Sequence, residues 1–149
     1  MRKILVLLAV FVLMAGFADA AERGTAKEAQ SMVKKAVAFY KKMGRDKATA
    51  EFGNPKGKFI EKDLYISVYD MNGVVVSHPY NRGLIGKNVL ALKDPDGKMF
   101  IKEFVDKAKA DNSGWVSYKY THPQTKKVES KKAYFEKTDG LIIQVGAYE

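Results

Sequence analysis

Apolar positions near the N-terminus recur at helical spacing and predict one long amphipathic helix. From Ala29 to Met43 they fall every three or four residues, as on one face of an α-helix. Thr25 and Glu28 precede this stripe with the spacing of a capping box, and Gly44 suits the helix end. A helix with a single apolar stripe has to lie across an apolar surface, which the rest of the chain must supply.

The pattern then changes from helical spacing to alternation. A short second helix is expected over residues 46–52, before the breaker Gly53-Asn54-Pro55. Leu64 to Tyr69 alternates, which predicts a strand with tyrosines on one face and aliphatic residues on the other. An Asn-Gly pair in the turn at residues 70–73 is typical of a hairpin, so Val74 to Ser77 is expected to return as the second strand.

The second half of the chain predicts one helix followed by three strands. Asp94 and Asp96 are expected to shape a tight turn and to cap a helix whose apolar positions run from 99 to 108. Further strands, joined by hairpin turns, are expected at Trp115 to Thr121, Val128 to Lys137 and Leu141 to Tyr148. Together these elements predict a PAS-like α+β fold with a five-stranded antiparallel sheet. The helix between strands two and three crosses one face, and the long N-terminal helix covers the other.

Residues 1–20 have the pattern of a Sec signal peptide. Arg2 and Lys3 precede an apolar run from Ile4 to Phe17, and Ala18-Asp19-Ala20 suits cleavage. We therefore expect an exported, periplasmic protein in which residues 21–149 form one domain. The alternative is an uncleaved anchor, but the run is shorter than the roughly 20 residues of a membrane-spanning helix.

Composition removes several classes of function. The chain has no cysteine, which excludes disulfides, zinc–thiolate sites, c-type haem attachment and thiol catalysis. It has two histidines and no serine in a nucleophile elbow, so we expect no enzyme, no cofactor and no metal site. The net charge of +9 comes from scattered lysines, which favours a solvated surface over nucleic-acid binding. The alternative is a basic interaction protein that binds an anionic surface or an acidic partner without a small ligand.

Several short motifs follow one another between residues 64 and 148. They are Ser77-His78-Pro79, Gly86-Lys87-Asn88, Asp94-Pro95-Asp96-Gly97, Gly114-Trp115, Tyr118-Lys119-Tyr120, Lys131-Lys132-Ala133-Tyr134 and Gly146-Ala147-Tyr148. In this order and spacing they resemble the single Cache domain, type 2. That family consists of extracytoplasmic, PAS-like sensor domains of chemoreceptors and sensor kinases. The resemblance extends over nearly all of the predicted domain.

The resemblance implies binding of a small organic acid, such as a short carboxylate. Chemoreceptors and sensor kinases continue into a membrane helix, whereas no second apolar segment follows Tyr148. We therefore expect a free-standing domain that acts through a membrane-bound chemoreceptor or sensor kinase. The long N-terminal helix is a candidate surface for a homodimer.

A short carboxylate needs one cation, a few donors and an apolar wall. The resemblance assigns the cation to Lys131, and alternation allows only one of Lys131 and Lys132 to face the pocket; the other role for Lys131 is an exposed strand lysine. His78 is either a donor to the ligand or a residue that holds its loop. His122 is expected to be exposed in a hairpin turn. The remaining candidates are phenolic donors: Tyr65, Tyr69, Tyr118, Tyr120 and Tyr134.

Overall fold

The computed structural model describes residues 22–149, so the predicted signal peptide lies outside the described residues. Within that range the chain forms three α-helices, one short 3₁₀-helix and five strands. In chain order they are α1 (Ala26–Met43), α2 (Arg45–Phe52), β1 (Ile66–Asp70), β2 (Val75–Ser77), η1 (Arg82–Leu84), α3 (Phe100–Ala110), β3 (Ser113–Thr121), β4 (Val128–Thr138) and β5 (Leu141–Tyr148). Every helix and strand expected from the sequence is present.

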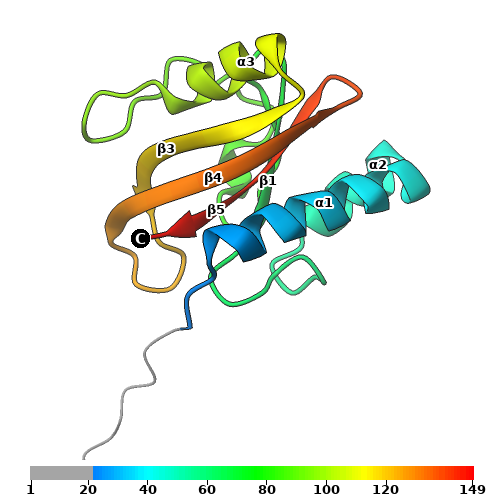
Figure 1. Cartoon of the computed structure of the whole chain (residues 1–149), viewed down its shortest axis with the longest axis horizontal. Coiled ribbons are helices and arrows are strands. Elements are labelled where there is room, and N and C mark those ends of the chain that lie inside the picture. Colours follow the sequence, from blue (N-terminus) through cyan, green and yellow to red (C-terminus); the bar gives the residue numbers. More distant parts are fainter. Residues whose placement is uncertain (1–21) are drawn as a thin grey trace, which may run out of the picture.

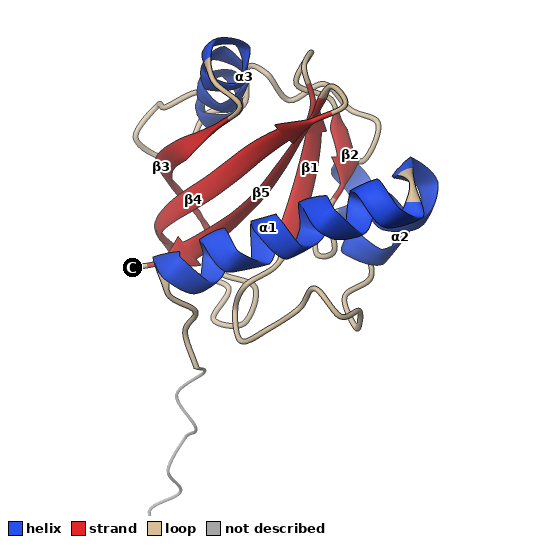
Figure 2. Cartoon of the chain, turned by 45° about the vertical axis from the view of Figure 1, so that its right-hand side comes forward, coloured by secondary structure: helices blue, strands red, loops and turns tan. Residues whose placement is uncertain are grey.

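The five strands form one antiparallel sheet in the order β2-β1-β5-β4-β3. The segment that contains α3 joins β2 to β3 and so carries the chain from one edge of the sheet to the other. Figures 1 and 2 show α1 lying across one face of the sheet, while α3 packs on the opposite face. This arrangement confirms the expected α+β fold. It also gives the sheet two different buried faces, of which the α3 face carries the polar residues described below.

Local sequence signals explain the start of α1 and the two faces of β1. The capping box at α1 is formed, with Glu28 N donating to Thr25 Oγ1 at 3.2 Å and Thr25 N donating to Glu28 Oε2 at 2.8 Å. The expected alternation holds at the start of β1 and in the two residues before it, because Leu64 and Ile66 pack into the core beneath α1 while Tyr65 points to the other face. No helix within residues 22–149 is long and apolar enough to cross a membrane.

Asp94 has one of the two roles expected of it. Its side chain accepts hydrogen bonds from the backbone N–H groups of Asp96 (3.0 Å), Lys98 (2.9 Å) and Lys119 (3.0 Å). It therefore shapes the turn, as expected, and also ties that turn to β3. The expected helix cap is wrong, since α3 begins after Met99 without a side-chain cap.

Candidate functional site

The side chain of Lys131 crosses the sheet from β4 to the start of β1. Its stem passes over Gly146 of β5, where a Cβ atom would lie only 2.7 Å from Lys131 Cγ. Glycine is therefore needed at this position because any larger residue would displace the lysine. At the end of this path Lys131 Nζ donates a hydrogen bond of 2.9 Å to Tyr65 Oη.

The ammonium group of Lys131 lies among four tyrosine rings. The distances from Nζ to the ring centroids are 4.1 Å for Tyr65, 4.8 Å for Tyr148, 5.6 Å for Tyr120 and 6.0 Å for Tyr118. These ring faces attract a cation, but none of them carries a full negative charge. Within residues 22–149 no carboxylate forms an ion pair with Lys131, whose exposed fraction is 2%.

Burial changes the protonation of Lys131. Loss of solvation lowers its pKa from the ordinary 10.5 to about 7, and the more distant charge of Asp63 opposes this shift only in part. Of the two roles considered for this residue, the structure excludes the exposed strand lysine. A buried amine without a paired carboxylate favours binding of an anionic ligand, which would supply the negative charge that the protein does not.

His78 both holds its loop and faces the tyrosines. Its Nδ1 accepts hydrogen bonds from the backbone N–H groups of Tyr80 (3.2 Å) and Asn81 (3.0 Å). In a neutral imidazole the proton must then lie on Nε2, which is free to donate. Burial, with a smaller contribution from the charge of Lys131, lowers the His78 pKa to about 3, so the ring is neutral at pH 7. Its centroid is 5.3 Å from that of Tyr65.

A cavity of about 540 Å³ opens beside this group, and its lining includes Tyr65, His78 and Tyr120. The loop after β2 adds an apolar wall through Leu84 and Leu92. Tyr65 and Tyr120 line the cavity and are also two of the rings around Lys131 Nζ, whereas Lys131 itself contributes no atom to this lining.

The remaining predicted tyrosines fall on both faces of the sheet. Tyr69 and Tyr118 share the face of Lys131 but lie deeper, under α3, where the Tyr118 ring stacks on Phe100 at 4.3 Å. Tyr134 points to the α1 face, where it packs against Trp115 and donates to Glu136. The sheet therefore separates Tyr134 from the other six predicted residues, because neighbouring residues of β4 alternate between faces.

His122 is buried, so the expectation of an exposed turn residue is wrong. Its exposed fraction is 1%, and its Nε2 lies 2.9 Å from Oδ2 of Asp63. Its Nδ1 accepts from the backbone N–H groups of Gln124 and Thr125, so Nε2 carries the proton and donates to the carboxylate. His78 accepts from the second and third residues after it in the same way. The repeated His-Pro pair was the sequence signal for this arrangement.

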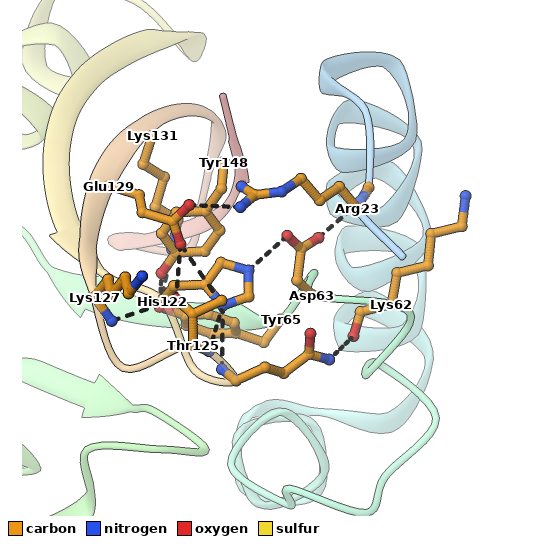
Figure 3. A network of polar contacts seen from close by, with 12 residues as sticks. Arg23, Lys62, Asp63, Tyr65, His122, Thr125, Lys127, Glu129, Lys131 and Tyr148 are labelled. Atoms are coloured by element: carbon orange, nitrogen blue, oxygen red, sulfur yellow. Dashed lines mark hydrogen bonds and ion pairs between the residues drawn. The ribbon is translucent and has the colours of Figure 1, made fainter. Parts of the chain in front are cut away.

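Asp63, which the sequence did not single out, joins this hairpin to the segment before α1. Its Oδ1 accepts a hydrogen bond of 2.7 Å from Gly24 N, and Arg23 forms an ion pair of 2.5 Å with Glu129 (Figure 3). The same hairpin contributes His122 to the cavity lining. Contacts therefore run without interruption from the cavity wall to the residues that precede α1.

Comparisons with known proteins agree with this architecture. The profile of the family described as Single Cache domain 2 matches residues 7–149. A sensor histidine kinase, MctS, of Rhizobium johnstonii is 37% identical over 89 residues, which are 58% of this chain and 19% of the kinase. A methyl-accepting chemotaxis protein, McpP, of Pseudomonas putida is 30% identical over 90 residues, which are 59% of this chain and 16% of that protein. The chain thus matches about a fifth or less of these relatives' length.

Two solved structures share the fold. A methyl-accepting chemotaxis protein from Vibrio parahaemolyticus superposes with a TM-score of 0.71 at 23% identity, over 82% of this chain and 86% of that one. A second structure is described as the structural basis for carboxylic acid recognition by a Cache chemosensory domain. It has a TM-score of 0.71 at 26% identity and covers 82% of this chain and 91% of its own.

Proposed function

The chain belongs to the single Cache domain 2 family, and on that premise we propose that it binds a small organic acid without turning it over. The observation that supports this most directly is the ammonium group of Lys131, which is buried among tyrosines with no carboxylate paired to it. One structural neighbour is described as recognising carboxylic acids, which is consistent with an anionic ligand.

The chemistry of the site fits a carboxylate in three respects. The ligand's charge would offset that of Lys131, and a charge-assisted hydrogen bond in a buried site is roughly twice as strong as a neutral one. Tyr65 O–H and His78 Nε2–H are further donors on the same side of the sheet. Tyr120 and Leu92 supply apolar contact for a short carbon chain. Turning of the Tyr65 and Tyr120 rings would open the cavity to the lysine.

The proposed biological role is sensing outside the cytoplasm. The domains of this family are sensor domains of chemoreceptors and sensor kinases. With export by the predicted signal peptide, the ligand would be bound in the periplasm, and a membrane-bound receptor or kinase would detect the occupied domain. The contacts between the cavity wall and the residues before α1 give such a partner a place to sense binding.

A thermal-shift screen of the purified protein tests the proposal. Short carboxylates, with amino acids and sugars as comparison compounds, are added to the wild type, to Lys131→Met and to Lys132→Met. Lys132 is the matched control, because it adjoins Lys131 but lies on the opposite face over Trp115. A ligand at 100 times its Kd stabilises by about 2.7 kcal/mol, which is several degrees in melting temperature. We expect that shift with carboxylates in the wild type and in Lys132→Met, and no shift in Lys131→Met.

Two results would contradict the proposal. Equal shifts of the melting temperature in the two lysine variants would show that Lys131 does not bind the ligand. The absence of a shift with any acid, after refolding has removed any co-purified ligand, would favour binding of the basic surface to an anionic partner.

The exposed face of α1 supports that second candidate, since it carries Lys27, Lys35, Lys41 and Lys42. Its signature would be binding to anionic lipid vesicles that weakens with salt.

A further inference from the structure

The two chain segments at the mouth of the cavity carry no acidic residue. One is the loop after β2, within residues 71–93, and the other is the hairpin between β3 and β4, within residues 112–128. Tyr80 and Leu92 of the loop and Lys126 of the hairpin line the same cavity. No aspartate or glutamate of the described residues contributes to that lining. Two segments that are distant in the sequence therefore join into one acid-free surface.

Five cationic side chains of these segments are exposed. They are Arg82, Lys87 and Lys93 of the loop and Lys126 and Lys127 of the hairpin. Among residues 22–149 none of the five forms an ion pair with a carboxylate. The acid-free surface ends towards α2, where Asp46 borders a neighbouring hollow together with Arg82 and Ile85. Unpaired cations of this kind create a positive field that attracts anions.

Apolar side chains are exposed between these cations. Tyr80 is 44% exposed, Ile85 42% and Leu92 39%. The described residues include six exposed large hydrophobic side chains, so half of them belong to this one loop. Single exposed apolar residues are ordinary, but a group of them bordered by polar residues indicates a contact surface for a protein or a membrane.

The combination of charges and apolar residues favours a membrane. Attraction of a small anion into the cavity explains the cations, but it gives no role to apolar side chains that point into water. Four of the five cations are lysines, a residue type that is depleted in protein–protein interfaces. Lysine acts as a point charge and contacts lipid phosphates without a fixed geometry. Tyrosine is enriched at the level of lipid headgroups, and aliphatic side chains enter the boundary with the acyl chains.

We propose that the mouth of the cavity is a membrane-docking surface, which binds an anionic phospholipid bilayer. The cations contact lipid phosphates, while Tyr80, Ile85 and Leu92 enter the boundary between headgroups and acyl chains. Docking places the opening of the cavity at the membrane surface. This surface is separate from the cationic face of α1, because Tyr120 of the cavity packs on the opposite face of the sheet.

Co-sedimentation with lipid vesicles tests the charges. The purified protein, without any added acid, should sediment with vesicles of equal parts phosphatidylglycerol and phosphatidylcholine and not with pure phosphatidylcholine. Binding should weaken with salt. Each cation near an anionic bilayer contributes about fivefold in affinity, so Lys87→Gln, Lys93→Gln and Lys126→Gln together should weaken binding about tenfold or more. The matched control combines Lys35→Gln, Lys41→Gln and Lys42→Gln, which remove the same charge from α1 and should weaken binding by about threefold or less.

A second pair of variants tests insertion of the loop. Ile85→Ser with Leu92→Ser should weaken vesicle binding about tenfold, because two exposed apolar side chains no longer leave water. The control, Met43→Ser with Val128→Ser, removes two exposed apolar side chains elsewhere and should change little. Tyr80→Trp places an indole in the loop, and its fluorescence should shift to the blue with anionic vesicles. Circular dichroism checks that each variant is folded.

Three results would overturn the proposal. The first is a wild type that does not sediment with anionic vesicles, which would leave the cations only the attraction of small anions. The second is an equal or larger loss in the α1 control, which would assign lipid binding to that helix. The third is a loss with the lysine variants alone, with no effect of the serine variants and no spectral shift, because the loop would then not insert. No acid is present in these experiments, so the proposed function and this inference can fail separately.

Discussion

Raising the pH from 7 to 9 should stabilise the ligand-free protein through Lys131. In the folded protein burial lowers the pKa of this lysine to about 7, whereas in the unfolded chain it returns to 10.5. Between these two values the unfolded state binds more protons than the folded state. The free energy of unfolding therefore rises with pH across this window and falls again as pH decreases toward 7.

The expected size follows from the same two pKa values. One unit of pKa difference corresponds to about 1.4 kcal/mol. At pH 7, which equals the pKa of the folded lysine, Lys131 is deprotonated in half of the folded molecules. Integration from pH 7 to pH 9 then gives a stabilisation of about 2 kcal/mol. The buried His78 has a pKa of about 3, so its contribution changes only below pH 6.5. Burial raises the pKa values of Tyr65 and Tyr118, which oppose the trend only above pH 10.

Urea unfolding at several pH values between 7 and 9 measures this effect. The wild type and Lys132→Met should gain about 2 kcal/mol over this range, and Lys131→Met should gain little. A saturating carboxylate should reduce the slope in the wild type, because the paired lysine keeps its proton. The same pH slope in Lys131→Met as in the wild type would refute the reasoning and would mean that Lys131 is solvated or paired.

Three further substitutions test separate parts of the structure. Gly146→Ala should destabilise the protein by about 1–3 kcal/mol in urea unfolding and weaken acid binding, because the new Cβ displaces the Lys131 stem. Tyr134→Phe should leave acid affinity in calorimetry within twofold, since its hydroxyl group faces α1; a large loss would contradict the assigned face. Asp63→Leu should lower stability by about 2 kcal/mol or more in thermal unfolding, because the buried His122 ring N–H and a backbone N–H lose their acceptor; an unchanged melting temperature would contradict this.

The sequence alone was sufficient for the elements and for the arrangement of the sheet. Helical spacing, the Thr25 capping box and strict alternation in the first strand are local patterns, and each was found as expected. The hairpin turns then left few ways to connect five strands. Alternation also decided the face of Tyr134, since the rule that separates Lys131 from Lys132 places Tyr134 with Lys132. That consequence was available from the sequence and was missed.

Only the tertiary structure decided which distant residues meet. The bond between His122 and Asp63 joins residues 59 positions apart, and no local pattern sets the approach of a hairpin to a loop. The burial of Gln144 could not be predicted from the sequence, because β5 is covered on both faces. All residues of that strand are buried, and it shows no alternation of apolar and polar positions. The depressed pKa of Lys131 likewise depends on its path over Gly146 into the tyrosine cluster. Sequence patterns specify which way a side chain points; packing decides what it meets and how much water it keeps.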